Sequence, residues 1–250
     1  MVELFPPDDI ERMLCVVAHP DDMEYGASAA VAEWTARGVE VAYLLLTAGE
    51  AGIRDMYPAE VGPLRAQEQR KACEIVGVEN LTILDLPDGM LEPSIEVRSR
   101  IAGEIRRFRP QAVMCTSWEL EVPWGLNHAD HRAAGLATVD AIRDADNPWI
   151  FSHQLSEGLT AWSTRWLLVT GTEPTHAIEL SRESVEKGVA SLEAHEVYLR
   201  ALPGHIPPRE IVEGAAASGA AALRETRSAV DDGATPTLEY ALGVRAIAMG

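Results

Sequence analysis

Short apolar strand segments alternate with helical segments throughout residues 1–145 of this chain. Residues Met13–Ala18 are continuously apolar, which is typical of a strand that is covered on both faces. Residues Glu24–Ala36 repeat small and apolar side chains at helical spacing, and Val39–Thr47 forms a second apolar run. A strand, a helix and a second strand in this order predict a right-handed crossover between parallel strands. The chain is therefore expected to build a parallel sheet with helices on its faces.

The same alternation continues along the chain and sets the other expected elements. These are a loop at Ala48–Gly62, a helix at Pro63–Val76, a strand at Leu81–Leu84, a helix at Ile95–Phe108, a strand at Ala112–Thr116, a loop at Trp118–Asn127, a helix at Asp130–Arg143, strands at Arg165–Thr170 and Thr175–Leu180, helices at Ser181–Leu199 and Glu210–Thr226, and a strand at Ala241–Ala248. The pattern predicts one α/β domain over 1–250, with a Rossmann-like, doubly wound, mostly parallel sheet and a less regular C-terminal segment.

Composition and charge exclude several classes of function. The 250 residues carry a formal net charge of −18, which repels nucleic-acid backbones and anionic membrane surfaces. The longest apolar runs are strand-sized and the acidic N-terminus lacks an apolar stretch, so neither a membrane span nor a secretory signal is expected. The three cysteines (Cys15, Cys73 and Cys115) fit no zinc-knuckle spacing, and we interpret them as reduced thiols of a cytoplasmic protein.

The first candidate for chemistry is His19-Pro20-Asp21-Asp22, directly after the first strand. Doubly wound sheets bind their ligands at this carboxyl edge. Imidazole nitrogens and carboxylate oxygens are good ligands for zinc and similar divalent metals. A turn here would let His19 and Asp22 converge on one ion, with Asp21 beside the metal and not bound to it. The alternative is a plain turn in which Asp22 caps the next helix.

A second polar cluster, His128-Ala129-Asp130-His131, follows the fourth strand at the same edge. Its histidines are three residues apart at the start of a helix, so they lie on nearly one face. One could complete a three-ligand metal site with an open position for water, and the other could face a substrate. Asp130 could orient a histidine through its other ring nitrogen. The alternative is a capping aspartate beside two solvated histidines, but two such motifs at one edge favour a site.

Several motifs occur in a fixed order along the chain. They are Ala18-His19-Pro20-Asp21-Asp22, Thr47-Ala48-Gly49-Glu50, Arg65 with Glu68, Leu86-Pro87-Asp88-Gly89, and His128-Ala129-Asp130-His131. In this series the chain resembles the PIG-L/LmbE-like family of zinc-dependent N-acetylglucosaminyl deacetylases, over residues 12–145. The resemblance implies an LmbE-like fold, with a metal-site half at 1–145 and a substrate-shaping part at 146–250. Members of this family form monomers, dimers and hexamers, so the resemblance is compatible with a homo-oligomer.

The resemblance also implies roles for the motif residues. The ligands of one zinc ion would be His19, Asp22 and His131, a set that would suit iron(II) as well. Asp21 would be the general base on the metal-activated water. His128 would stabilise the oxyanion and protonate the leaving amine, while Asp130 would orient a histidine. Zinc lowers the pKa of bound water to about 7, so these roles are chemically consistent at neutral pH.

Further residues are candidates for binding the substrate. Arg65 and Asp88 match positions that hold the glucosamine ring in sugar-binding members of the family, and Glu50 is a third candidate. Trp124, on the second long loop, could stack on a sugar face, although buried packing is the commoner role for a single tryptophan. Where family members carry His-Ser-Gln, this chain has His195-Glu196-Val197. We interpret His195 as structural and place His205 on a loop, either at the pocket mouth or elsewhere on the surface.

These observations predict a metal-dependent amide hydrolase that removes an acetyl (acyl) group from an N-acetylglucosamine-type sugar or conjugate. One alternative keeps the same site but cuts a larger amide of a glucosaminyl thiol conjugate or natural product. Another is a non-catalytic metal- or sugar-binding protein, although such a protein has no use for an aspartate beside the metal. A dinucleotide site is not expected, because the first turn lacks a GxGxxG pattern. The expected partner is a small N-acylated amino sugar.

Overall fold

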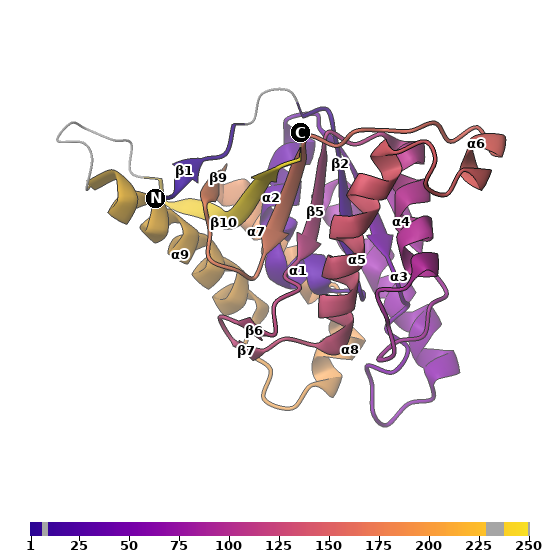
Figure 1. Ribbon diagram of the computed structural model, residues 1–250. Helices are drawn as coiled ribbons and strands as arrows, with labels where there is room; N and C mark the ends of the chain where they lie inside the picture. Colours follow the sequence, from indigo (N-terminus) through magenta and orange to yellow (C-terminus); the bar gives the residue numbers. More distant parts are fainter. Residues whose placement is uncertain (7–9, 229–237, 250) are drawn as a thin grey trace.

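A computed structural model of the protein describes residues 1–6, 10–228 and 238–249. One eight-stranded sheet runs through it in the order β1-β9-β10-β8-β5-β2-β3-β4 (Figure 1). Its strands are β1 (Glu3–Leu4), β2 (Arg12–Val17), β3 (Glu40–Leu45), β4 (Asn80–Ile83), β5 (Ala112–Thr116), β8 (Trp166–Thr170), β9 (His176–Leu180) and β10 (Tyr240–Ala248). Strand β10 alone in this sheet runs antiparallel to its neighbours, β8 and β9, within the described residues. The predicted α/β class with a mostly parallel sheet is confirmed.

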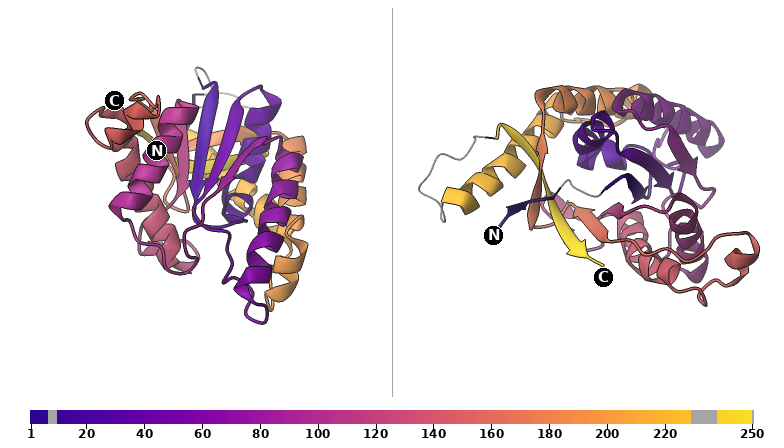
Figure 2. Two further views of the ribbon diagram at one scale, coloured as in Figure 1. Left: turned by 90° about the vertical axis from the view of Figure 1, so that its right-hand side faces the viewer. Right: turned by 90° about the horizontal axis from the view of Figure 1, so that it is seen from above.

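Helices cover both faces of this sheet. They are α1 (Asp22–Gly26), α2 (Ser28–Ala36), α3 (Pro58–Val76), α4 (Ile95–Phe108), α5 (Ala129–Asp146), α6 (His153–Ser156), α7 (Arg182–Glu193), α8 (Glu196–Ala201) and α9 (Pro208–Ser228). Helices α2, α3, α7 and α9 lie on one face, and α4 and α5 lie on the opposite face (Figure 2). Their buried side chains form a separate core on each face. Strand β2 shows why its sequence is continuously apolar, because Cys15 faces the first core and Val16 the second.

The structure moves several predicted boundaries. Helix α3 begins at Pro58, where proline suits the first turn, and it carries Pro63 inside, so the loop before it is shorter than expected. The helix predicted at Glu24–Ala36 is divided at Ala27, whose φ of −155° is not helical. The helix predicted at Ser181–Leu199 is divided between α7 and α8. The second long loop contains a small hairpin of β6 (Glu121–Val122) and β7 (Gly125–Leu126).

The three cysteines are free and buried, and burial raises the pKa of each thiol. Within the described residues, no helix is both long enough and apolar enough to cross a membrane.

Replacement of two glycines of α9 by alanine is expected to change the stability of the protein in opposite directions. A Cβ at Gly219 would lie 2.1 Å from the backbone oxygen of Ala241 in β10, whereas a Cβ at Gly214 would meet nothing within 4 Å. We expect Gly219→Ala to lower the free energy of unfolding by about 3 kcal/mol through overpacking. Gly214→Ala should raise it by up to about 1 kcal/mol through helix propensity. Denaturant unfolding of both variants measures this, and equal effects would contradict the close packing of α9 on β10.

Candidate metal and catalytic site

Both histidine motifs lie at the carboxyl edge of the sheet, where the segments that follow two adjacent strands enter helices. Strand β2 pairs directly with β5, so the segments after Val17 and Thr116 leave the sheet side by side. The first segment continues into α1 and the second into α5, whose first residue is Ala129. This parallel pairing brings the two motifs together although more than a hundred residues separate them in the sequence.

Three of the motif residues form a group that could hold a metal ion. The ligand atoms of His19, Asp22 and His131 all lie within 4.8 Å of one another. Asp22 Oδ1 is 3.0 Å from His131 Nε2 and 3.7 Å from His19 Nδ1. Its other oxygen, Oδ2, accepts hydrogen bonds from the backbone N–H groups of Ala18 and His19. These backbone bonds fix the carboxylate and leave Oδ1 turned toward the two imidazoles.

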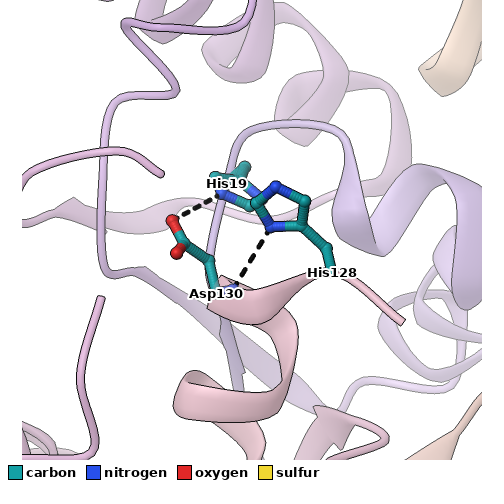
Figure 3. A group of neighbouring side chains, drawn as sticks. All are labelled: His19, His128 and Asp130. Carbon is teal, nitrogen blue, oxygen red and sulfur yellow. Dashed lines mark hydrogen bonds and ion pairs between the residues drawn. The ribbon is translucent and has the colours of Figure 1, made fainter. Parts of the chain in front are cut away.

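A second group shares His19 and adds His128 and Asp130 (Figure 3). Asp130 Oδ2 is 3.2 Å from His19 Nε2, and the backbone N–H of Asp130 donates to His128 Nδ1. The carboxylate of Asp130 is fully buried and also accepts hydrogen bonds from the backbone N–H groups of Gly89 and Leu91. Because its oxygens are already occupied, Asp130 suits the orientation of His19 better than metal binding.

The charges of this cluster favour a cation. Burial by itself lowers the pKa of His19, but the carboxylates of Asp22 and Asp130 outweigh it and raise that pKa to about 12. Burial likewise lowers the pKa of His131, yet Asp22 raises it overall. Burial raises the pKa of Asp22, and the two histidines together hold it well below its usual range. A divalent metal would replace the protons on these imidazoles.

Asp21 lies between two of these residues but points to a different partner. Its backbone is left-handed, with φ of 83° and ψ of −19°, a conformation that aspartate tolerates better than most residues. Its Oδ2 atom is 3.1 Å from Arg65 Nη2. Burial raises the pKa of Asp21 to about 6, although the guanidinium of Arg65 acts in the opposite direction. Asp21 is therefore a buried carboxylate at the edge of the histidine cluster, and it is paired with Arg65 rather than with a histidine.

Arg65, predicted to bind a sugar, lies in the pocket wall and is itself buried. Its guanidinium donates to the backbone oxygens of Gly49 and Pro20 at 3.0 and 2.6 Å. It also stacks on the ring of Tyr198, 3.8 Å from the centroid. The structure therefore places Arg65 as the cation that faces Asp21, and the contacts of its Nη1 and Nη2 atoms hold the guanidinium in the pocket wall.

The other predicted binding residues divide into two groups. Asp88 Oδ1 is 3.0 Å from His19 Nε2, and Glu50 accepts the backbone N–H of Asp88, so Glu50 supports the loop that carries Asp88. Trp124 is 71% exposed, its ring lies beside Gly171, and it is not among the residues that line the pocket. The structure thus brings Asp88 and Glu50 to the cluster and does not bring Trp124 there.

A pocket of about 360 Å³ opens over these side chains. Its lining residues are His19, Asp21, Asp22, Tyr25, Ala51, Gly52, Arg65, Asp88, Gly89, His128, His131 and Tyr198. The sequence interpretation missed Tyr25 and Tyr198 in this lining. Tyr25 follows Asp22 by three residues on α1, so helical spacing was a usable signal, whereas nothing local marks Tyr198. The hydroxyl of Tyr25 also contacts His205 Nε2, which places His205 next to a residue that lines the pocket.

Comparison with known proteins assigns the family. Residues 14–142, which include both histidine motifs, match the family described as PIG-L, GlcNAc-PI de-N-acetylase. This chain belongs to the PIG-L family. It is 31% identical over 196 residues to the diacetylchitobiose deacetylase of Thermococcus kodakarensis, covering 76% of this chain and 71% of that protein. It is 25% identical over 240 residues to a Bacillus anthracis protein named probable N-acetyl-α-D-glucosaminyl L-malate deacetylase 2, covering 92% and 91% of the two chains.

Solved structures agree with this PIG-L assignment at the level of the fold. The N,N'-diacetylchitobiose deacetylase of Pyrococcus horikoshii has a TM-score of 0.82 and 22% sequence identity, covering 97% of this chain and 86% of that chain. The predicted family and LmbE-like fold are confirmed. As a member of the PIG-L family, the chain is a deacetylase, a hydrolase of carbon–nitrogen bonds.

Proposed function

We propose that this chain removes the acetyl group from the amide nitrogen of an N-acetylglucosamine-type sugar or conjugate, with one zinc ion held by His19, Asp22 and His131. The observation that carries the proposal is the division of labour between two adjacent aspartates. Asp22 has one oxygen held by backbone and the other facing two imidazoles, while Asp21 faces Arg65 at the edge of the same pocket. A binding protein that needed only the metal would gain nothing from the second buried carboxylate.

The residues present fit a divalent metal. Two imidazoles and one carboxylate oxygen form the three-ligand set that hydrolytic zinc sites use, and the set also suits iron(II). When bound there, zinc would act as a Lewis acid and lower the pKa of a water molecule to about 7. Asp22 Oδ1 is the central ligand atom of the group, because it lies near both histidines.

The chain's own residues would then move the protons. The carboxylate of Asp21 would accept a proton from the attacking water, and its burial is consistent with a base that must stay out of bulk solvent. His128 Nδ1 accepts the backbone N–H of Asp130, so in the neutral ring the proton sits on Nε2. That N–H would stabilise the developing oxyanion. The leaving amine would take the proton that Asp21 accepted from the water, so that His128 stays neutral throughout.

The remaining residues would position these groups and bind the sugar. Asp130 would orient His19, and Asp88, supported by Glu50, would accept a hydroxyl of the amino sugar. Arg65 would mainly hold the carboxylate of Asp21 and the ring of Tyr198 in place. Strand β5 pairs with β8, so the sheet is continuous across residues 145 and 146. We therefore propose a single domain in which the part at 146–250 shapes the pocket through α8 and its Tyr198.

A product assay tests this function. The purified chain, loaded with zinc, is incubated with N-acetylated glucosamine conjugates and, separately, with N-acyl analogues that carry larger acids. We expect stoichiometric acetate and free amine, lost after chelation of the metal and restored by zinc. Release of only a larger acid would replace the deacetylase by an amidase of the same site. No release from any amide, with one metal bound per chain, would contradict the proposed function.

A further inference from the structure

The backbone of Asp21 is held by a side chain that the proposed chemistry does not use. The backbone N–H of Asp21 donates to Gln69 Oε1 at 2.9 Å. Gln69 follows Arg65 by four residues on α3, so both side chains leave the same face of that helix. Arg65 contacts the carboxylate of Asp21, and Gln69 contacts its backbone. One helix thus contacts both the backbone and the carboxylate of Asp21, the residue whose backbone is left-handed.

The amide of Gln69 is itself oriented by a buried carboxylate. Gln69 Nε2 donates to Glu24 Oε1 at 3.1 Å and to Cys73 Sγ at 3.6 Å. A carboxylate accepts hydrogen bonds and donates none, so the NH₂ group of Gln69 must face Glu24. Its oxygen is then left for the N–H of Asp21. The reverse orientation would set two acceptors against each other and two donors against each other.

Glu24 in turn contacts the last turn of α7 and the residue that precedes α8. Its Oε2 atom lies 3.5 Å from Nε2 of His195, which is fully buried, and Ser191 donates to its Oε1 atom. Burial lowers the pKa of His195, but Glu24 and Asp21 raise it overall. A continuous set of contacts therefore runs from His195 through Glu24 and Gln69 to Asp21.

We propose that Gln69 is a positioning residue for Asp21, and that Glu24, paired with His195, holds the Gln69 amide in the orientation this requires. The inference rests on the proposed function, in which the carboxylate of Asp21 accepts the proton of the attacking water. The metal ligands have their own support, because Asp22 is fixed by the backbone of Ala18 and His19. Loss of Gln69 should therefore affect proton transfer and leave metal binding intact.

Gln69→Leu tests the proposal against Gln67→Leu, the same change at an exposed position of α3. We expect Gln69→Leu to lower kcat between about 10- and 100-fold, the effect of a misplaced catalytic group. KM should change less than about threefold, with one metal still bound per chain. Gln67→Leu should match the wild type. A Gln69→Leu enzyme with unchanged kcat, or one whose whole loss is in KM or bound metal, would overturn the proposal.

Two substitutions of Glu24 separate orientation from simple packing. Glu24→Gln keeps an oxygen that can accept from Gln69 Nε2, so most of kcat should survive. Glu24→Leu removes the acceptor and should resemble Gln69→Leu. The double variant Glu24→Leu/Gln69→Leu should fall no further than either single variant, because both act on the same contact. Equal losses in Glu24→Gln and Glu24→Leu would overturn the role of Glu24.

A crystal structure of metal-free Gln69→Leu gives a readout that is independent of activity. We expect residue 21 to leave the left-handed region or the contact of its carboxylate with Arg65 to break. An unchanged backbone and contact would overturn the proposal. The proposed function fails separately, if Asp21→Asn retains turnover with metal bound. If Asp21→Asn loses turnover and Gln69→Leu keeps it, only the inference about Gln69 fails.

Discussion

Asp21→Asn is expected to lower kcat by about 10²–10⁴-fold, the usual contribution of a general base. Asparagine has the same shape and also tolerates the left-handed backbone that residue 21 adopts. The backbone N–H that donates to Gln69 remains, so the loop should keep its course. The change removes only the ability to take a proton and the charge that faces Arg65. Steady-state kinetics of acetate release, together with metal analysis, measures the effect.

The control for this variant is Asp55→Asn, the same change on an exposed part of the loop after β3. It should retain wild-type kcat and bound metal. If Asp21→Asn keeps one metal per chain and kcat stays within a few-fold of the wild type, Asp21 is not the base. If it loses the metal, then Asp21 contributes to the ligand set and the division between the two aspartates is wrong.

His131→Ala is expected to abolish turnover by removing the metal. Changes to residues that merely support a ligand cost about 10–100-fold in metal affinity, so loss of a ligand should cost at least about 100-fold. His131 is the least buried of the three proposed ligands and its imidazole meets only Asp22 among them at hydrogen-bonding distance, so the fold should survive. Metal analysis after dialysis, and the zinc concentration needed to restore activity, measure the loss.

His153→Ala provides the matched control, because His153 is exposed on α6. Its metal content and activity should equal those of the wild type. A His131→Ala protein that retains one tightly bound metal would favour the other histidine group, in which His19 is joined by His128 and Asp130. His128→Ala would then be the variant that loses the metal.

Elements with a strong local pattern were predicted well. The helix at Ile95–Phe108 and the strand at Ala112–Thr116 have the predicted bounds, because periodicity and a serine cap mark the helix and a continuous apolar run marks the strand. The start of α3 was not predicted, since Pro58 and Pro63 both suit a first turn and only packing decides between them. The break before α8 was also missed, because His195 and its flanking residues continue a helical pattern.

Candidate binding residues were less predictable than candidate ligands. The two histidine motifs follow strands of one parallel sheet, and that alone places them at one edge. Trp124 was a candidate because it is an aromatic residue on a loop near the motif, but the hairpin of β6 and β7 carries its ring onto Gly171. Tyr198 lines the pocket because α8 places its ring against the guanidinium of Arg65, a contact between residues far apart in the sequence.

The sequence by itself determined the fold class, the family and the edge of the sheet where His19, Asp22 and His131 meet. Strand periodicity and motif order can be recognised locally in the sequence. In a parallel sheet the carboxyl ends of the strands lie at one edge, so motifs that follow two such strands meet there. Only the tertiary structure decided that Arg65 faces Asp21. It also decided that Gln69 contacts the Asp21 backbone and is itself contacted by Glu24, which lies next to His195. These contacts join helices distant in sequence, and the packing of α3 and α7 around α1 selects them from side chains that local patterns cannot tell apart.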